Sequence, residues 1–309
     1  MATFLSAQHA RNTIRLHWKD AGFAPLPNLL TESVADELGT SSLDTQLGAL
    51  YVFVDECLGL LRYTTHYFLS GIPDSGQTSA LYYRLAVKQL RNLSAVRVLC
   101  AAGLDGNARM QLRLLYETSL VWVRVLFDPV FRADFERAIG PKDANTFWHE
   151  HMSKGRNEKW LEINLTAQGV TWFGGDNDLV REMKQEMSLS SHPTIWQAIF
   201  DAEEDLSDPQ DRLVLGSASG ASNFTLTMAI FAAAIPFALF PEPDYGLRTV
   251  DLSAVRPWPP AHVSNPNWDV YNSKLRLMMP RLLIASVNFS KLLAQSKKPD
   301  PSGVAGAPE

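Results

Sequence analysis

One expected helix of this chain combines apolar side chains with charged residues that could bind or activate an anionic ligand. Segment 105–127 reads DGNARMQLRLLYETSLVWVRVLF, and at about 100° per residue four of its charges share one arc: Arg109, Arg113, Glu117 and Arg124. The remaining circumference is apolar or small, so most of the helix should be covered. The charged arc is then either the one face that meets solvent or the floor of a cleft. If an Arg113–Glu117 pair is buried there, removing Glu117 should cost about 3–5 kcal/mol.

A serine and a histidine one helical turn apart form a second candidate group. Ser188 and His192, in EMSLSSHP, share a helix face and could act as nucleophile and base. That chemistry needs an orienting group and an oxyanion site, and the chain has no G-x-S-x-G motif; the alternative is a histidine that hydrogen-bonds near a helix end. We expect this polar face to meet the charged arc, because buried polar groups find partners. His192 or Glu117 would then be the general acid or base and Arg113 the charge stabiliser.

Basic residues on the preceding helix form a third group. Arg84, Lys88 and Arg91 follow an i, i+4, i+7 pattern, and with Arg109 on the next helix they predict an anion-binding groove. The alternative is a solvated basic face that pairs with acids elsewhere, such as the acidic patch at 201–211.

Metal ligands and reactive cysteines are not expected. His149 and His151 lie two positions apart, so they would point apart on a helix and could not share a metal ion. The chain has two cysteines, Cys57 and Cys100, both in apolar helical runs. They are predicted to be buried thiols in a reducing compartment. No metal and no cofactor are therefore predicted.

The elements that must position these residues are helices. Periodicity predicts an all-α antiparallel bundle with long central helices, because strand signals are weak and several links are short. Asp105 is the expected N-cap of the central helix, and Gly103 its preceding C-terminal glycine. Gly71 and Pro73 are expected to close the long second helix. The expected helices span 4–19, 42–69, 78–102, 105–127, 129–139, 143–164, 176–191, 223–240 and 268–295, with a Pro-rich irregular excursion at 241–267.

The length allows one large domain or two, and the composition is ordinary for a globular protein. The 309 residues are 46% hydrophobic and 20% charged, with a net charge of −5, which argues against a protein that coats nucleic acid non-specifically. We expect one domain over 1–296 and a disordered tail at 297–309. Segment 213–241 lacks charge, but its strongly apolar part is shorter than the roughly 20 residues of a membrane span, so we interpret it as a core helix. A cytoplasmic protein is predicted, with a homo-oligomer left open.

Two sequence motifs resemble a widespread bacterial family of unknown function. L-R-L-L-Y-E at 112–117 and S-L-S-S-H-P at 188–193 are similar to that family's R-x-x-x-E helix and downstream S-x-x-x-H-P. The similarity covers 45–240 and implies an all-α fold with Arg113, Glu117, Ser188 and His192 at its cleft. A weaker similarity is to the HEPN superfamily, helical bundles that often cleave RNA and carry Arg a few residues before His. RNTIRLH at 11–17 and RPWPPAH at 256–262 fit that spacing, although neither lies late in the bundle.

These features predict a helical protein whose polar cleft binds an anionic ligand, either a nucleotide or an RNA phosphate. The resemblances add metal-independent acid–base cleavage, as in a defence or toxin-type ribonuclease, as the reaction to expect if the cleft is catalytic. The alternative is a non-enzymatic scaffold or interaction protein whose polar cluster fixes the helix register. Stable membrane insertion is not expected.

Overall fold

The structure, a computed structural model, describes residues 7–20, 22, 42–75, 77–167, 184–185, 187–190 and 220–238. Every regular element of these residues is a helix, which confirms the all-α prediction. The elements are α1 Ala7–Asp20, α3 Ser42–Ser75, α4 Gln77–Ala101, α5 Asp105–Phe127, α6 Pro129–Arg137, α7 Pro141–Phe147, η1 Trp148–Met152, η2 Ser153–Gly155, α8 Arg156–Ala167 and α11 Gly220–Ala238.

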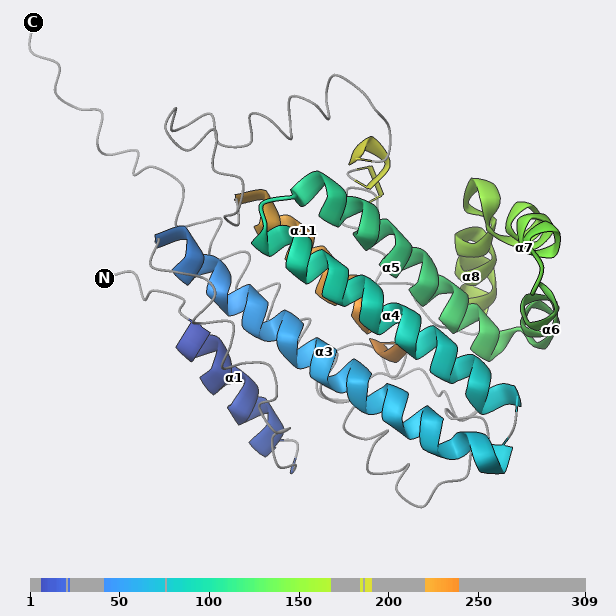
Figure 1. The fold of residues 1–309 in the computed structure, drawn as a ribbon, viewed down its shortest axis with the longest axis horizontal. Helices are drawn as coiled ribbons and strands as arrows, with labels where there is room; N and C mark the ends of the chain where they lie inside the picture. Colours follow the sequence, from blue (N-terminus) through green and yellow to red (C-terminus); the bar gives the residue numbers. More distant parts are fainter. Residues whose placement is uncertain are drawn as a thin grey trace, which may run out of the picture.

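Three long helices, α3, α4 and α5, lie side by side and are joined by short links, so that neighbours run antiparallel (Figure 1). α11 packs against all three, and α1 packs on α3. Aromatic side chains fill the space where α3, α4 and α5 meet: the ring centroid of Phe68 lies 5.4 Å from that of Tyr82 and 6.3 Å from that of Trp122. Burial of these rings is a large part of what holds the bundle together.

The turn between α4 and α5 confirms one expected cap and corrects the other. Gly103 has φ +69°, and the amide of Leu104 donates to the carbonyl of Leu99, the pattern of a helix that ends on a left-handed glycine. The N-cap of α5 is Leu104, not Asp105 as predicted. Asp105 is buried as the first residue of α5, where its carboxylate accepts a hydrogen bond from Ser222 on α11. The carboxylate therefore joins two helices instead of capping one.

Two helices of the bundle contain a proline. α3 continues through Gly71 and Pro73 to Ser75, so the expected end at residue 69 is wrong. The reason is that α3 packs along α4, and tertiary packing overrides helix propensity. α11 also contains a proline, Pro236, which is buried within it. Its apolar sequence forms a core helix, as expected, and no helix in the described residues has the length and apolarity of a membrane span.

Polar side chains join α5 to its neighbours inside the bundle. Ser119 is fully buried; its hydroxyl donates to the carbonyl of Ala232 on α11 at 2.6 Å and accepts from the amide nitrogen of Gln89 on α4. At the other end of the bundle, Cys57 and Cys100 are buried free thiols, as predicted, and burial raises the pKa of both well above the usual range. Both are therefore protonated and chemically quiet.

A group of short helices packs at the C-terminal end of α5 (Figure 1). Asp128 caps α6 by accepting hydrogen bonds from the amides of Val130 and Phe131, with Pro129 in the first turn. The guanidinium of Arg124 lies 4.2 Å from the ring centroid of Phe131 and 4.6 Å from that of Trp160, and it donates to Asp128. Its burial lowers its pKa, and its role is to fasten α6 and α8 to α5.

The single helix expected over 143–164 is wrong. The structure divides this stretch into the α-helix α7, the π-helix η1, the short 3₁₀ turn η2 and the α-helix α8. Lys154 and Gly155 adopt left-handed backbone angles, with φ of +58° and +70°, which a continuous right-handed helix cannot contain. The expected helices at 176–191 and 268–295, the excursion at 241–267 and the tail at 297–309 fall mainly or wholly outside the described residues.

Candidate functional site

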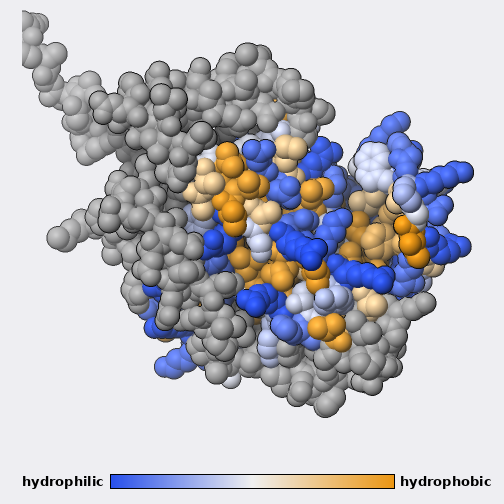
Figure 2. All heavy atoms as spheres, viewed as in Figure 1, coloured by the Kyte–Doolittle hydropathy of each residue, from blue (hydrophilic) through white to orange (hydrophobic). Residues whose placement is uncertain are grey.

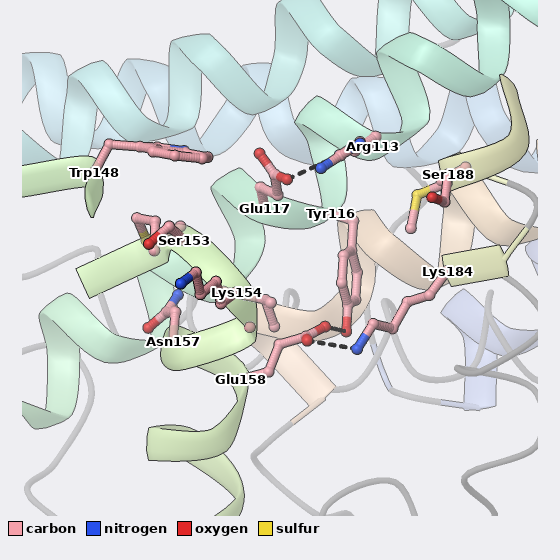
Figure 3. Close-up of a pocket in the computed structure, with 14 residues that line it drawn as sticks. Arg113, Tyr116, Glu117, Trp148, Ser153, Lys154, Asn157, Glu158, Lys184 and Ser188 are labelled. Carbon is pink, nitrogen blue, oxygen red and sulfur yellow. Dashed lines mark hydrogen bonds and ion pairs between the residues drawn. The ribbon is translucent and has the colours of Figure 1, made fainter. Parts of the chain in front are cut away.

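A pocket of about 410 Å³ opens where α5 faces η1, η2 and the start of α8 (Figure 3). Lys184, Met187 and Ser188 also line it. Its size is within the range of roughly 300–1,000 Å³ that is typical of small-molecule sites. Its lining combines charged, polar and apolar side chains: Arg113, Tyr116, Glu117, Leu120, Trp148, Met152, Ser153, Lys154, Gly155, Asn157, Glu158, Lys184, Met187 and Ser188.

The α5 side of the pocket carries the predicted Arg113–Glu117 pair. The side chains lie one helical turn apart, and Arg113 Nε donates to Glu117 Oε1 at 3.1 Å. They retain 41% and 36% of their exposure, so the pair is partly buried, as predicted, but neither desolvated nor fully in solvent. A ligand that enters the pocket can therefore reach both groups without breaking the core.

The opposite wall carries a second carboxylate with two donors. Glu158, in the first turn of α8, accepts a hydrogen bond from the Tyr116 hydroxyl at 2.7 Å and from the Lys184 ammonium at 2.5 Å. A negative charge at this position is also favoured by the helix dipole. Burial, together with the Glu158 charge, raises the pKa of Tyr116 well above the usual range. Tyr116 is therefore a neutral hydrogen-bond donor, not a proton acceptor.

The backbone between α7 and α8 is irregular where it borders the pocket. η1 is a π-helix, which is rare and is found frequently at functional sites, and it supplies Trp148 and Met152 to the lining. Lys154 follows in the left-handed region, which costs a non-glycine residue about 1–2 kcal/mol. The freed carbonyl of His149 accepts hydrogen bonds from Ser153 Oγ and from the Arg156 guanidinium. Neighbouring side chains thus stabilise a costly turn at the pocket wall.

Asn157 is the pocket residue whose burial is hardest to explain by the needs of the fold alone. Its side chain is 2% exposed, and neither its amide nitrogen nor its amide oxygen has a hydrogen-bond partner among the described residues. Leaving such a group unsatisfied costs about 1–3 kcal/mol. Gln89 in the core also has an unpartnered amide oxygen, but its nitrogen is bonded. Asn157 lines the pocket and lies on the same side as Trp148 and Ser153 (Figure 3).

The charges of the lining sum to an excess of one positive charge. Its cations are Arg113, Lys154 and Lys184, and its carboxylates are Glu117 and Glu158. Arg113 and Lys184 each contact one carboxylate, whereas exposed Lys154 forms no ion pair within the described part of the chain. In the same residues, no three histidine, cysteine or acidic side chains form a cluster that could hold a metal ion.

The structure brings together three of the four residues predicted for the cleft. Arg113, Glu117 and Ser188 line one pocket, while His192 lies outside the described residues. Arg109, predicted to bind ligand, is instead 3% exposed and donates to Thr225 on α11. Arg109 lies on the same face of α5 as Arg113. At the position of Arg109, however, α11 packs against that face and covers it.

The basic residues Arg84, Lys88 and Arg91 are exposed on α4. The face of the molecule over α4 and α5 carries both hydrophilic and hydrophobic side chains (Figure 2). The three basic residues do not enter the polar pocket; Lys88 lies instead at a neighbouring, apolar pocket. The predicted groove that would join them to Arg109 is not formed, because Arg109 points into the core.

Most of the far wall of the pocket was not predicted from the sequence. Trp148, Lys154, Asn157 and Glu158 were assigned to one polar helix. Gly155 inside that segment was the available signal, because a glycine within a helical pattern often marks a break. The pairing of Glu158 with Tyr116, 42 positions earlier, has no local signature.

Comparison with models of protein families, with curated proteins and with solved structures finds no match to this chain.

Proposed function

We propose that the pocket beside α5 binds a small organic anion, with nucleotides as the first class to test. The observation that carries the proposal is Asn157, a residue of the lining of a cavity of ligand size, whose buried carboxamide donors and acceptor are unpartnered in the described residues. A ligand that offers both an acceptor and a donor would satisfy it. An amide group or a hydroxyl group, such as those of a nucleotide's ribose, has this pattern.

The charges of the pocket lining favour an anionic ligand. The lining carries one more cation than carboxylate, and Lys154 has no acidic partner in the described residues. Arg113 is oriented by Glu117 and remains 41% exposed, so its guanidinium is within reach of a phosphate or carboxylate group in the pocket. A concave pocket suits a compact molecule better than an extended RNA strand, which would require a basic track.

Acid–base cleavage of the bound anion is a second candidate function. Glu117 is the group that would transfer the proton, because its carboxylate lies in the pocket lining and remains 36% exposed. Tyr116 is unsuited to that role, since its raised pKa keeps it protonated and its hydroxyl donates to Glu158. The non-enzymatic scaffold remains the alternative, and it predicts no ligand in this pocket.

The test is titration of the protein with AMP, followed by the shifts of its backbone amides in NMR. We expect the largest shifts at the pocket, around 113–117 and 153–158. Arg113→Gln should weaken AMP binding about tenfold, which corresponds to loss of one charge-assisted contact. Arg84→Gln is the matched control, because Arg84 is exposed on α4 outside the pocket and should leave the affinity unchanged.

Three results would contradict the proposal. The first is the absence of amide shifts at millimolar AMP and inorganic phosphate. The second is a loss of affinity in Arg84→Gln that equals the loss in Arg113→Gln, which would assign binding to the exposed basic face of α4. The third is unchanged affinity in Arg113→Gln.

A further inference from the structure

A second pocket, of about 230 Å³, adjoins the polar one on the other side of Glu117. Its lining is mainly apolar and includes three aromatic rings, those of Phe135, Phe147 and Trp148. The helices α4, α5, α6, α7 and η1 all contribute to it. For scale, an apolar cavity of about 150 Å³ accommodates benzene. This pocket therefore has room for an aromatic ring but not for a large hydrophobic molecule.

The two pockets have a common wall. Glu117, Trp148 and Met152 line both of them, so the carboxylate, the indole and the thioether separate a polar compartment from an apolar one. Trp148 is 46% exposed, which is unusual for so large an apolar side chain and places its ring at the boundary. Methionine is a flexible side chain that adapts to differently shaped neighbours. A single ligand that reaches past this wall would contact both compartments.

We propose that the ligand consists of an anionic group joined to a planar aromatic ring, with the anion in the polar pocket and the ring in the apolar one. This inference rests on the proposed function, because the polar pocket must hold the anion. The aromatic lining favours a ring over an alkyl chain, since rings stack or pack edge-to-face. The ring could be the base of a nucleotide or a simple aryl group, and the two share this chemistry.

The experiment compares three probes of increasing size: inorganic phosphate, phenyl phosphate and AMP. Dissociation constants come from the amide shifts of the full chain. We expect the two ring-bearing probes to bind about tenfold more tightly than phosphate, since ring stacking and burial add favourable free energy. A greater gain for AMP than for phenyl phosphate would identify the nucleobase as the source, and a gain for phenyl phosphate alone would identify an aryl group.

Filling the apolar pocket tests the placement of the ring. Ala144 on α7 lines this pocket and is exposed, so Ala144→Trp should fold and occupy the space of the ring. It should abolish the affinity gain of the ring-bearing probes and leave phosphate binding unchanged, and Ala144→Leu should do the same to a smaller degree. Ala133→Trp is the matched control, because Ala133 is an exposed alanine on the neighbouring helix α6 outside both pockets.

The outcomes separate this inference from the proposed function. If phosphate binds in an Arg113-dependent manner but neither ring adds affinity, the inference is overturned and the proposed function stands. The inference is equally overturned if the folded Ala144→Trp and Ala144→Leu variants keep the full gain. If Arg113→Gln changes the binding of none of the three probes, the proposed function falls, and this inference falls with it.

Discussion

Two arginine–carboxylate pairs in this molecule have the same chemistry and different surroundings. Arg97 on α4 donates to Asp55 on α3 at 2.6 Å, and the exposed fractions of the two side chains are 14% and 1%. Arg113 donates to Glu117 at 3.1 Å, with 41% and 36% exposed. The first pair joins two helices across the bundle, whereas the second lies within one helix at a pocket wall. The difference indicates that the first pair maintains the fold and the second is available to a ligand.

The structure around the two ion pairs differs as well. Elsewhere inside the bundle, Ser119 on α5 also joins helices, because its hydroxyl contacts α4 and α11. Around the exposed pair, the backbone contains a π-helix, a left-handed lysine and the unpartnered Asn157. Natural proteins concentrate such local costs at functional sites. Within the described residues, the pocket region is thus the part whose local structure contributes least to the stability of the fold.

The largest expected effect separates the two pairs by stability. Asp55→Ala leaves the Arg97 charge largely buried beside α3 without its closest carboxylate, and should lower the free energy of unfolding by about 3–5 kcal/mol. Glu117→Ala should lower it by less than about 1 kcal/mol, because its partner remains partly solvated. The measurement is chemical denaturation of both variants and the parent. Equal losses would remove the distinction between the regions.

A smaller effect is expected from relieving the turn at the pocket wall. Lys154→Gly should raise the free energy of unfolding by about 0.5–1 kcal/mol, because glycine adopts a positive φ without steric cost. The same variant should weaken phosphate binding, since it removes a cation of the lining. Lys154→Asn separates the two effects, because asparagine tolerates the left-handed region but carries no charge. A loss of stability in Lys154→Gly would show that the side chain supports the fold.

The smallest effect concerns pH and a carboxyl group of the bundle. Burial raises the pKa of Glu56 above its usual 4.5, although a hydrogen bond from Trp18 Nε1 at 2.6 Å acts in the opposite direction. The folded chain therefore binds this proton more tightly than the unfolded chain, so the group's stabilising contribution falls as the pH rises above 4.5. Glu56→Gln keeps the acceptor oxygen and lacks the charge.

Denaturation as a function of pH checks this expectation. The parent should lose stability relative to Glu56→Gln as the pH rises from 4.5 toward neutrality, and the two should converge at lower pH. The opposite result, a parent that gains stability relative to the variant over that range, would contradict this expectation. It would mean that the fold favours the ionised carboxylate of Glu56 over its protonated form, as it does for a carboxylate in an ion pair.

The sequence allowed prediction of the helices with strong periodicity, because their apolar faces determine where they pack. The bounds of α5 and the left-handed Gly103 were predicted correctly, and so was the partial burial of Arg113 and Glu117. The surroundings of Arg109 were not predicted. Helical geometry shows on which face of the helix a side chain lies, but not which neighbouring helix covers that face. The two consecutive left-handed residues Lys154 and Gly155 break a stretch in which helix propensity alone predicts a continuous helix.

The central claim is that Asn157 is kept for a ligand and not for the fold, and replacing its carboxamide by a similar apolar group tests it most directly. For Asn157→Leu we expect a free energy of unfolding that is unchanged or higher by about 1–2 kcal/mol, together with an AMP affinity about tenfold lower. Asn164→Leu is the control, because that asparagine lies on the same helix, donates to the Trp160 carbonyl and should leave AMP binding unchanged. An Asn157→Leu protein that is clearly destabilised and binds AMP as the parent does would contradict the claim.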